Sequence, residues 1–205
     1  MKKTIITISR EFGSGGREIG KKLAEQLNVP FYDKELIEIA AKESGLDKEL
    51  FEEEDSRTSK GFRLLGALGY SLGGPLSTIT ELSLNDRLFL VQSQVIEQVA
   101  KEGACVIVGR CADYVLKDNP DVIRLFFYAP LEDCIRRVVD QNGISAKEAE
   151  KKIAKIDKYR ADYYKYYTGN AWNDARNYDF CLDTSSMSYE KLVAVVKDII
   201  KIYQE

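Results

Sequence analysis

Three closely spaced glycines near the N-terminus form the stretch of the sequence best suited to chemistry. Gly13, Gly15 and Gly16 follow an apolar, β-branched run and precede helix-forming residues over 21–27. A strand, a glycine turn and a helix in this order direct backbone N–H groups and a helix N-terminus at an anion, usually a phosphate. The alternative is a tight strand–helix turn that binds no ligand. The candidate residues for binding phosphate are Gly13, Ser14, Gly15, Gly16 and Arg17.

This glycine loop matches the common phosphate motifs only in part. In the pattern G-x-x-x-x-G-K-[ST], Gly15 is the second glycine, but Arg10 stands at the first. Gly16 occupies the lysine position, and Arg17 occupies that of the hydroxyl residue. The dinucleotide pattern G-x-G-x-x-G also fails, because Glu18 replaces its third glycine. A guanidinium in the first helical turn can clamp phosphate oxygens, so Arg17 is the candidate to replace the lysine.

Two carboxylates, Glu11 and Glu18, flank the loop. A bare carboxylate repels phosphate, so each must either pair with Arg10 or Arg17 or reach a magnesium ion. We favour pairing, in which a neighbouring glutamate holds Arg17.

Two more polar groups directly follow predicted strands. Asp33 comes after the second strand and Arg110 after the third. Ligands of parallel α/β sheets bind at the carboxyl ends of the strands, so both residues are expected to converge on the loop. Asp33 is either a helix N-cap or an acceptor-binding residue. Arg110 either pairs with a neighbouring helix or, as we favour, holds a substrate phosphate through its two-pronged guanidinium.

A charged segment towards the C-terminus supplies the remaining candidates. Asp157 and Arg160 lie three residues apart on a long predicted helix and therefore share a face. Arg136 and Arg137 lie on the helix before it. The alternative for all four is a solvated charged surface, which is the usual meaning of such a run.

The composition of the chain excludes several kinds of chemistry. The 205 residues are 44% hydrophobic, carry a net charge of −3 and contain no histidine, which excludes Ser-His-Asp and Cys-His catalysis and histidine-ligated metals. The cysteines have no metal-ligand spacing and are expected to be buried free thiols. We therefore predict no metal-binding residue. The chain has no basic excess for nucleic acid and no apolar run long enough for a membrane, so we expect a cytoplasmic protein.

Apolar runs and helical patterns alternate five times along the chain. The strands are predicted over 4–8, 31–32, 104–108, 122–128 and 178–182. The helices are predicted over 17–27, 33–42, 84–101, 130–139, 145–168 and 189–203. Such alternation is typical of an α/β fold with a parallel sheet and helices on both faces. A short acidic helix is predicted over 47–57. The glycine-rich stretch 59–80 is a cap over a site, an amphipathic cover, or a contact between copies in a homo-oligomer.

Four motifs give the chain a resemblance over nearly its full length. They are the Ile-Thr-Ile and Gly-Ser-Gly-Gly-Arg-Glu run of 6–18, Phe-Tyr-Asp-Lys-Glu at 31–35, Val-Ile-Val-Gly-Arg at 106–110, and Tyr-Asp-Phe-Cys-Leu-Asp-Thr-Ser at 178–185. In order and spacing they resemble the cytidylate kinase-like branch of the P-loop nucleoside monophosphate kinases. The resemblance implies a three-layer P-loop fold whose five-stranded parallel sheet has the order 2-3-1-4-5. It further implies a core of 1–32, 86–139 and 173–205, a nucleoside-monophosphate-binding insertion of about 33–85 and a helical lid of about 140–172.

The same resemblance implies ATP as the donor, Mg²⁺ as the cofactor and a pyrimidine monophosphate as the acceptor. The loop would hold the donor phosphates, while Arg110, Asp157 and Arg160 would bind the acceptor. Arg136 or Arg137 falls near the arginine at the entrance of the lid. The chain departs from the family at Gly16, at Arg17, and at Val108, where an aspartate is usual.

Three functions therefore stay open. The first is transfer of the ATP γ-phosphoryl group to a (d)CMP-like acceptor, in which Arg17, Arg136 and Arg137 neutralise charge. The second is nucleotide or anion binding at a degenerate, non-catalytic site. The third is a kinase for another small molecule.

Overall fold

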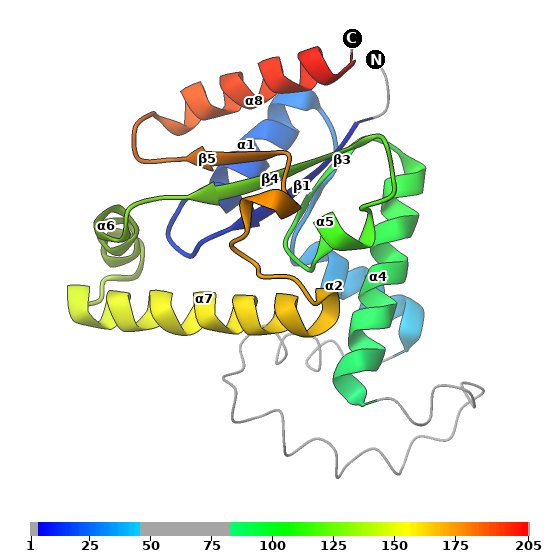
Figure 1. Cartoon of the computed structure of the whole chain (residues 1–205), viewed down its shortest axis with the longest axis horizontal. Helices are drawn as coiled ribbons and strands as arrows, with labels where there is room; N and C mark the ends of the chain where they lie inside the picture. The colour runs from blue at the N-terminus through cyan, green and yellow to red at the C-terminus, as the bar shows by residue number, and fades with distance from the viewer. Residues whose placement is uncertain (1–3, 46–82, 205) are drawn as a thin grey trace.

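Five parallel strands form the central sheet of the computed structural model, which describes residues 4–45 and 83–204 (Figure 1). The strands are β1 (Ile5–Arg10), β2 (Phe31–Tyr32), β3 (Cys105–Val108), β4 (Val122–Tyr128) and β5 (Phe180–Asp183). Their order is β2-β3-β1-β4-β5, and the predicted order 2-3-1-4-5 is confirmed.

Helices follow or connect the strands, as the alternating pattern predicts. They are α1 (Gly16–Leu27), α2 (Glu35–Ser44), α4 (Leu84–Glu102), α5 (Ala112–Val115), α6 (Leu131–Asn142), α7 (Ala146–Thr168), η3 (Ala175–Asn177) and α8 (Tyr189–Gln204). The sequence did not reveal α5 or η3, because one turn of helix is too short to produce a periodic apolar pattern.

Helices cover both faces of the sheet and give three layers (Figure 1). Successive strand residues point to opposite faces, so Ile5 and Ile107 pack against α2, α4 and α5. Ile6, Ile8 and Val106 pack against α1 and α8 on the other face. This explains why β1 and β3 are apolar at almost every position, as expected for strands buried on both sides.

The register of β1 places the candidate chemistry at one edge of the sheet. Ile8 of β1 pairs with Val108 of β3, and Arg10 pairs with Phe127 of β4. The glycine loop after β1 therefore begins beside Gly109, the residue that follows β3.

The predicted long helix is α7, and its N-terminus carries the predicted capping box. The Ser145 side chain accepts the N–H of Glu148, whose carboxylate in turn accepts the N–H of Ser145 at 3.0 Å. On one side, Ala149 and Ile153 of α7 pack with Cys134 and Val138 of α6. Within the part of the chain that the structure describes, no helix is long and apolar enough to cross a bilayer.

Two local interpretations are wrong. Asp33 is not the N-cap of α2, because Lys34 holds that position and no side chain caps the helix. Cys105, Cys111 and Cys134 are buried free thiols as expected, but Cys181 is exposed, because β5 is an edge strand. The interpretations of 47–57 and 59–80 lie outside the described residues, as does most of the predicted insertion.

Truncation of a core residue on β3 should lower stability strongly. Ile107 of β3 is fully buried. Its strand lies between β1 and β2, and its side chain packs in the cluster that includes α4. We expect Ile107→Ala to lower the free energy of unfolding by about 2–5 kcal/mol, because it leaves a cavity. Ile202→Ala is the matched control, since Ile202 is 69% exposed, and should change it by less than about 0.5 kcal/mol in the same urea titration. Equal losses in the two variants would contradict this packing.

Candidate active site

The loop after β1 has the backbone geometry of an anion-binding turn. Gly13 and Gly15 have φ angles of 84° and 82°, in the left-handed region that favours glycine. Gly15 is also the N-cap of α1 and provides no side-chain hydrogen bond to the first turn. A helix N-terminus without a side-chain cap can direct its N–H groups at a phosphate. The geometry is compatible with a phosphate loop, and phosphate binding stays a prediction.

Two side chains bind the carbonyl groups of this loop. Arg137, on α6, donates from Nη1 to the carbonyls of Ser14 at 2.9 Å and Gly13 at 3.3 Å. The buried Thr184 hydroxyl donates to the Ser14 carbonyl at 2.6 Å and accepts from Arg137 at 3.0 Å. Arg137 therefore positions the loop in this structure, whereas its proposed action on a transferring phosphate stays untested.

Arg136 lies away from these contacts. It is exposed, with 65% of its side chain accessible, and pairs with Asp133 on its own helix. The structure thus shows that Arg137 contacts the loop and Arg136 does not, a distinction that the sequence could not make.

Arg17 is held by a different carboxylate from the one expected. Its Nε donates to Oδ2 of Asp33 at 2.5 Å, so the hypothesis that a neighbouring glutamate holds it is wrong. This hydrogen bond is the main reason that the pKa of Arg17 is raised. The side chain of Arg17 is 51% exposed. The pair connects the first turn of α1 to the chain between β2 and α2.

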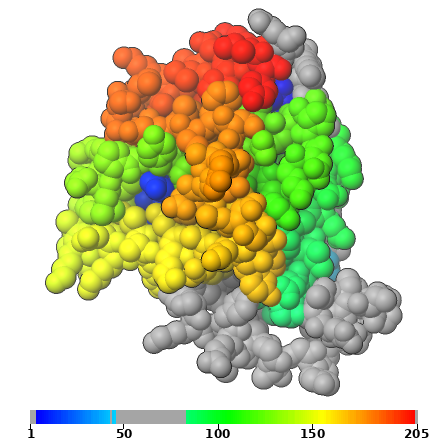
Figure 2. Space-filling model, viewed as in Figure 1, coloured from blue at the N-terminus to red at the C-terminus, as the bar shows by residue number. Residues whose placement is uncertain are grey.

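Glu11 lies behind the loop and has a raised pKa. Burial is the main cause, and the nearby carboxylates of Asp157 and Asp183 add to it. Its carboxylate accepts the N–H of Ala129 at 3.3 Å, which lowers the pKa in part. In the space-filling view, a dark blue patch of the N-terminal segment reaches the surface between α6, α7 and the chain before β5 (Figure 2). No group of three metal-ligating side chains occurs among residues 4–45 and 83–204.

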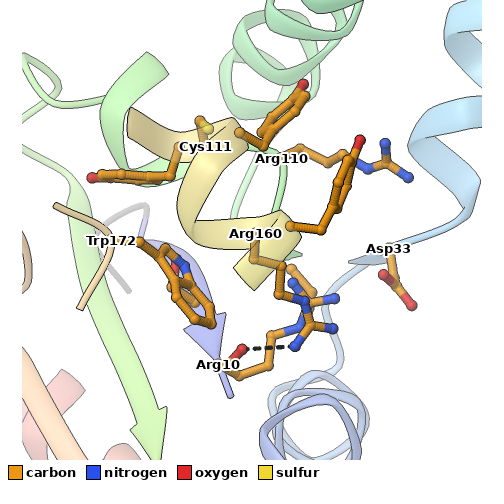
Figure 3. A pocket seen from close by; sticks show the side chains of 12 residues that line it. Arg10, Asp33, Arg110, Cys111, Arg160 and Trp172 are labelled. Carbon is orange, nitrogen blue, oxygen red and sulfur yellow. Dashed lines mark hydrogen bonds between the residues drawn. The ribbon is translucent and has the colours of Figure 1, made fainter. Parts of the chain in front are cut away.

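A cavity of about 60 Å³ brings together three residues predicted from different segments (Figure 3). Asp33 after β2, Arg110 after β3 and Arg160 on α7 all line it. Aromatic side chains form part of its wall, including Tyr159 and Trp172. The structure therefore brings these residues from distant segments to one cavity, and their role in binding stays a prediction.

Arg110 and Arg160 are positioned by polar contacts to other elements. Arg110 has a left-handed backbone, with φ of 59°, and donates to the Gln92 side chain of α4 at 3.2 Å. Arg160 donates to the Arg10 carbonyl at 3.0 Å and to Asp157 at 3.2 Å. Both residues line the cavity, but in Figure 3 the guanidinium of Arg160 lies close to Arg10, while that of Arg110 extends away from them.

Asp157 supports the site without lining the cavity. Its Oδ1 accepts the backbone N–H of Phe12 at 2.8 Å and the Arg160 guanidinium, so it joins α7 to the loop. Burial raises the pKa of Asp157, and the charge of Arg160 partly opposes this rise. Asp157 and Arg160, which were predicted to share a face of one helix, form an ion pair, and their role in binding the acceptor stays a prediction.

Two residues of the site escaped prediction. Arg10 lines the cavity, and the only sequence signal was its place at the first glycine position of the phosphate motif. Asp113, on the short helix α5, is 3% exposed beneath the cavity-lining residues Ser9 and Tyr164. Its carboxylate accepts the Tyr164 hydroxyl at 2.6 Å and the Ser9 hydroxyl at 3.5 Å. A lone carboxylate in an apolar stretch has no spacing that would reveal this network.

The strand order and the glycine loop before α1 define the fold of the P-loop kinases, which shikimate kinase shares. The chain belongs to the cytidylate kinase-like family, whose pattern it matches over residues 5–186.

Known proteins agree with this placement. The cytidylate kinase of Pyrococcus horikoshii is 30% identical over 199 residues, covering 97% of this chain and 88% of that protein. A crystal structure of an uncharacterized protein from Eubacterium ventriosum has a TM-score of 0.72 at 28% identity, covering 97% of this chain and 98% of the other. Shikimate kinase from Bacteroides thetaiotaomicron has a TM-score of 0.52 at 16% identity, with 97% and 98% coverage, and shares the fold.

The buried carboxyl of Asp113 should make stability depend on pH. Burial raises its pKa above the ordinary value of 3.8, despite opposing hydrogen bonds from Tyr164 and Ser9. The folded protein then binds this proton more tightly than the unfolded chain. The stability that proton binding contributes is therefore lost as the pH rises above about 4. Asp113→Asn removes that loss. Urea titrations at about pH 4.5 and about pH 8 should show the variant gaining stability relative to wild type at the higher pH.

Asp198→Asn is the matched control, because Asp198 is exposed and pairs with Lys201 at the surface. It should leave the pH dependence of wild type unchanged. The raised pKa of Asp113 would be contradicted if Asp113→Asn and wild type differed in free energy of unfolding by the same amount at both pH values.

Proposed function

We propose that this protein transfers the γ-phosphoryl group of ATP to a nucleoside monophosphate, with CMP or dCMP as the leading acceptor. The observation that carries the proposal is the cavity at the carboxyl ends of β1 and β3, which Arg110 and Arg160 both line. Membership of the cytidylate kinase-like family supports the same chemistry. Phosphoryl transfer depends mainly on positioning and on neutralising charge, and the site offers both.

Each predicted residue has a role in this proposal. Gly13, Ser14, Gly15 and Gly16 hold the donor phosphates through their backbone. Arg110 and Arg160 bind the acceptor phosphate, with Asp157 fixing Arg160. Asp33 orients the acceptor and also holds Arg17 close to the loop.

The remaining cations act on the transferring group. Arg17 replaces the missing lysine, while Arg136 and Arg137 neutralise the transferring group when the lid closes. The lid in this proposal is about 140–172, the acceptor-binding insertion is about 33–85, and the core is 1–32, 86–139 and 173–205. The contacts of α7 with Phe12 and Arg10 support the assignment of the lid, because they hold it against the loop.

The fit of the cofactors differs between ATP and magnesium. The left-handed glycines and the uncapped first turn of α1 fit the phosphates of ATP. The position of the magnesium-binding hydroxyl is Arg17, and Ser14 Oγ donates to the Glu11 carbonyl. The described residues therefore fit a magnesium ion that arrives with ATP and is held mainly by phosphate oxygens and water. Such an ion would neutralise part of the phosphate charge.

Binding without transfer is the second candidate function. The observation in its favour is that Gly16 and Val108 replace the lysine and the acid of related kinases. A kinase for another small-molecule acceptor is a third candidate, because the sequence of the glycine-rich stretch 59–80 is unlike that of a familiar nucleotide pocket.

A coupled turnover assay tests the proposal directly. With Mg²⁺ present, ATP and GTP are each offered with CMP, dCMP, UMP, AMP and GMP. Activity with a pyrimidine monophosphate is expected. No transfer to any nucleoside monophosphate would refute the kinase, and calorimetric binding of ATP without turnover would favour the second candidate.

Arg17→Ala tests the replacement of the lysine. We expect kcat to fall about a hundredfold or more, as when one charge-stabilising donor is removed. Lys21→Ala is the matched control, because Lys21 is an exposed cation one turn further along α1, and its kcat should stay near wild type. Equal rates for Arg17→Ala and wild type would show that Arg17 does not replace the missing lysine.

A further inference from the structure

Three arginines line one small cavity, which we call the arginine cavity. It is lined by Arg10 of β1, Arg110 after β3 and Arg160 of α7 (Figure 3). Among the described residues that line it, Asp33 is the one carboxylate, and Arg17 already binds that group. Asp157 offsets the charge of Arg160. The arginine cavity therefore carries excess positive charge on residues from three separate segments.

The structure makes specific room for Arg10. A Cβ atom on Gly109 would lie 2.4 Å from Nη1 of Arg10, so the guanidinium lies directly against the backbone of Gly109. Gly109 has a φ of 76°, which also favours glycine. Arg10 thus reaches the residue immediately before Arg110. Two guanidinium groups from the neighbouring strands β1 and β3 therefore lie at the same edge of the sheet.

Arg10 also explains the glycine at the lysine position of the loop. A Cβ atom on Gly16 would lie 2.8 Å from Cβ of Arg10 and 2.9 Å from Cβ of Phe127. A side chain at position 16 therefore collides with a side chain at position 10. In the motif G-x-x-x-x-G-K the cation stands at the seventh position and glycine at the first. Here arginine stands at the first and glycine at the seventh, so the two departures from the motif are sterically linked.

Like charges in a confined space repel, and their convergence is favourable when an anion binds between them. A phosphate monoester carries up to two negative charges and three terminal oxygens, and guanidinium groups match these oxygens as two-pronged donors. The aromatic residues Tyr159 and Trp172 form an apolar part of the cavity wall next to the arginines. A cavity with both charged and apolar lining suits a phosphate that carries an organic group.

We propose that Arg10 is a further acceptor-binding residue, which contacts the phosphate of a nucleoside monophosphate together with Arg110 and Arg160. Compared with the motif, the chain has no cation at position 16 and carries one at position 10, which we place on the acceptor side of the site. The proposal rests on the proposed function in one respect, namely that the acceptor is a phosphate monoester.

Calorimetry on the full chain tests this role. Wild type and Arg10→Gln are titrated with CMP, UMP, AMP and GMP, with the matching nucleosides as uncharged counterparts, and with ATP. Arg10→Gln should weaken binding of the preferred monophosphate about tenfold or more, because one charge-assisted contact is lost. Binding of the nucleoside and of ATP should change less than about twofold.

Arg176→Gln is the matched control, since Arg176 is 88% exposed and pairs with Asp174 outside the cavity. It should bind every ligand as wild type does. Arg10→Lys keeps the charge but loses the two-pronged geometry, so it should recover part of the lost monophosphate affinity.

The inference is overturned if Arg10→Gln binds the monophosphate within twofold of wild type. It is also overturned if the variant loses affinity for ATP and keeps its affinity for the monophosphate. Failure of wild type to bind any of the four monophosphates has the same consequence. Turnover is not part of this test. A protein that binds a monophosphate through Arg10 without phosphorylating it refutes the proposed kinase and supports the inference.

The steric link is tested by thermal unfolding without ligand. Gly16→Ala should lower the melting temperature of wild type, and should lower that of Arg10→Gly by less, because one of the two collisions is removed. Equal losses from Gly16→Ala in both backgrounds overturn the steric explanation.

Discussion

The parallel pairing of β1 with β3 on one side and β4 on the other is the constraint on which the site depends. Ile8 pairs with Val108, the last residue of β3, and β1 continues past this level to Arg10. The chain after each strand then enters the same space, which places Arg10 against Gly109. Both faces of the sheet are covered by helices, so the strand ends are the part of the sheet left for a ligand.

The helix α7 adds the second half of the site and ties it to the loop. Asp157 accepts the N–H of Phe12, and Arg160 donates to the carbonyl of Arg10. The same helix is anchored in the core through the hydroxyl of Tyr164, which donates to the buried Asp113. Arg160 is thereby positioned by the backbone that leads into the glycine loop. Any movement of α7 must alter these contacts, so the two sides of the site are mechanically connected.

Much of the fold was predictable because it depends on local patterns. Alternating apolar runs fixed the strands, and the capping box at Ser145 fixed the start of α7. The sequence also placed Arg110 and Asp33 at strand ends, so their meeting at one edge of a parallel sheet was predictable, whereas Arg160 was assigned to the same site only by the family resemblance. The short helix α5 and its Asp113 were not predictable, because one turn gives no periodicity and a buried carboxylate has no sequence signature.

The sequence by itself determined the class of fold, the glycine loop and the segments that supply its cations. The tertiary structure alone decided which cation faces which group. It paired Arg17 with Asp33, turned Arg137 to the loop carbonyls, and brought Arg10 into the arginine cavity. The physical reason is that a guanidinium on a long side chain can reach several partners. The choice among them depends on distances between segments far apart in the chain, such as the 2.8 Å that separates Cβ of Arg10 from the place of a side chain at position 16.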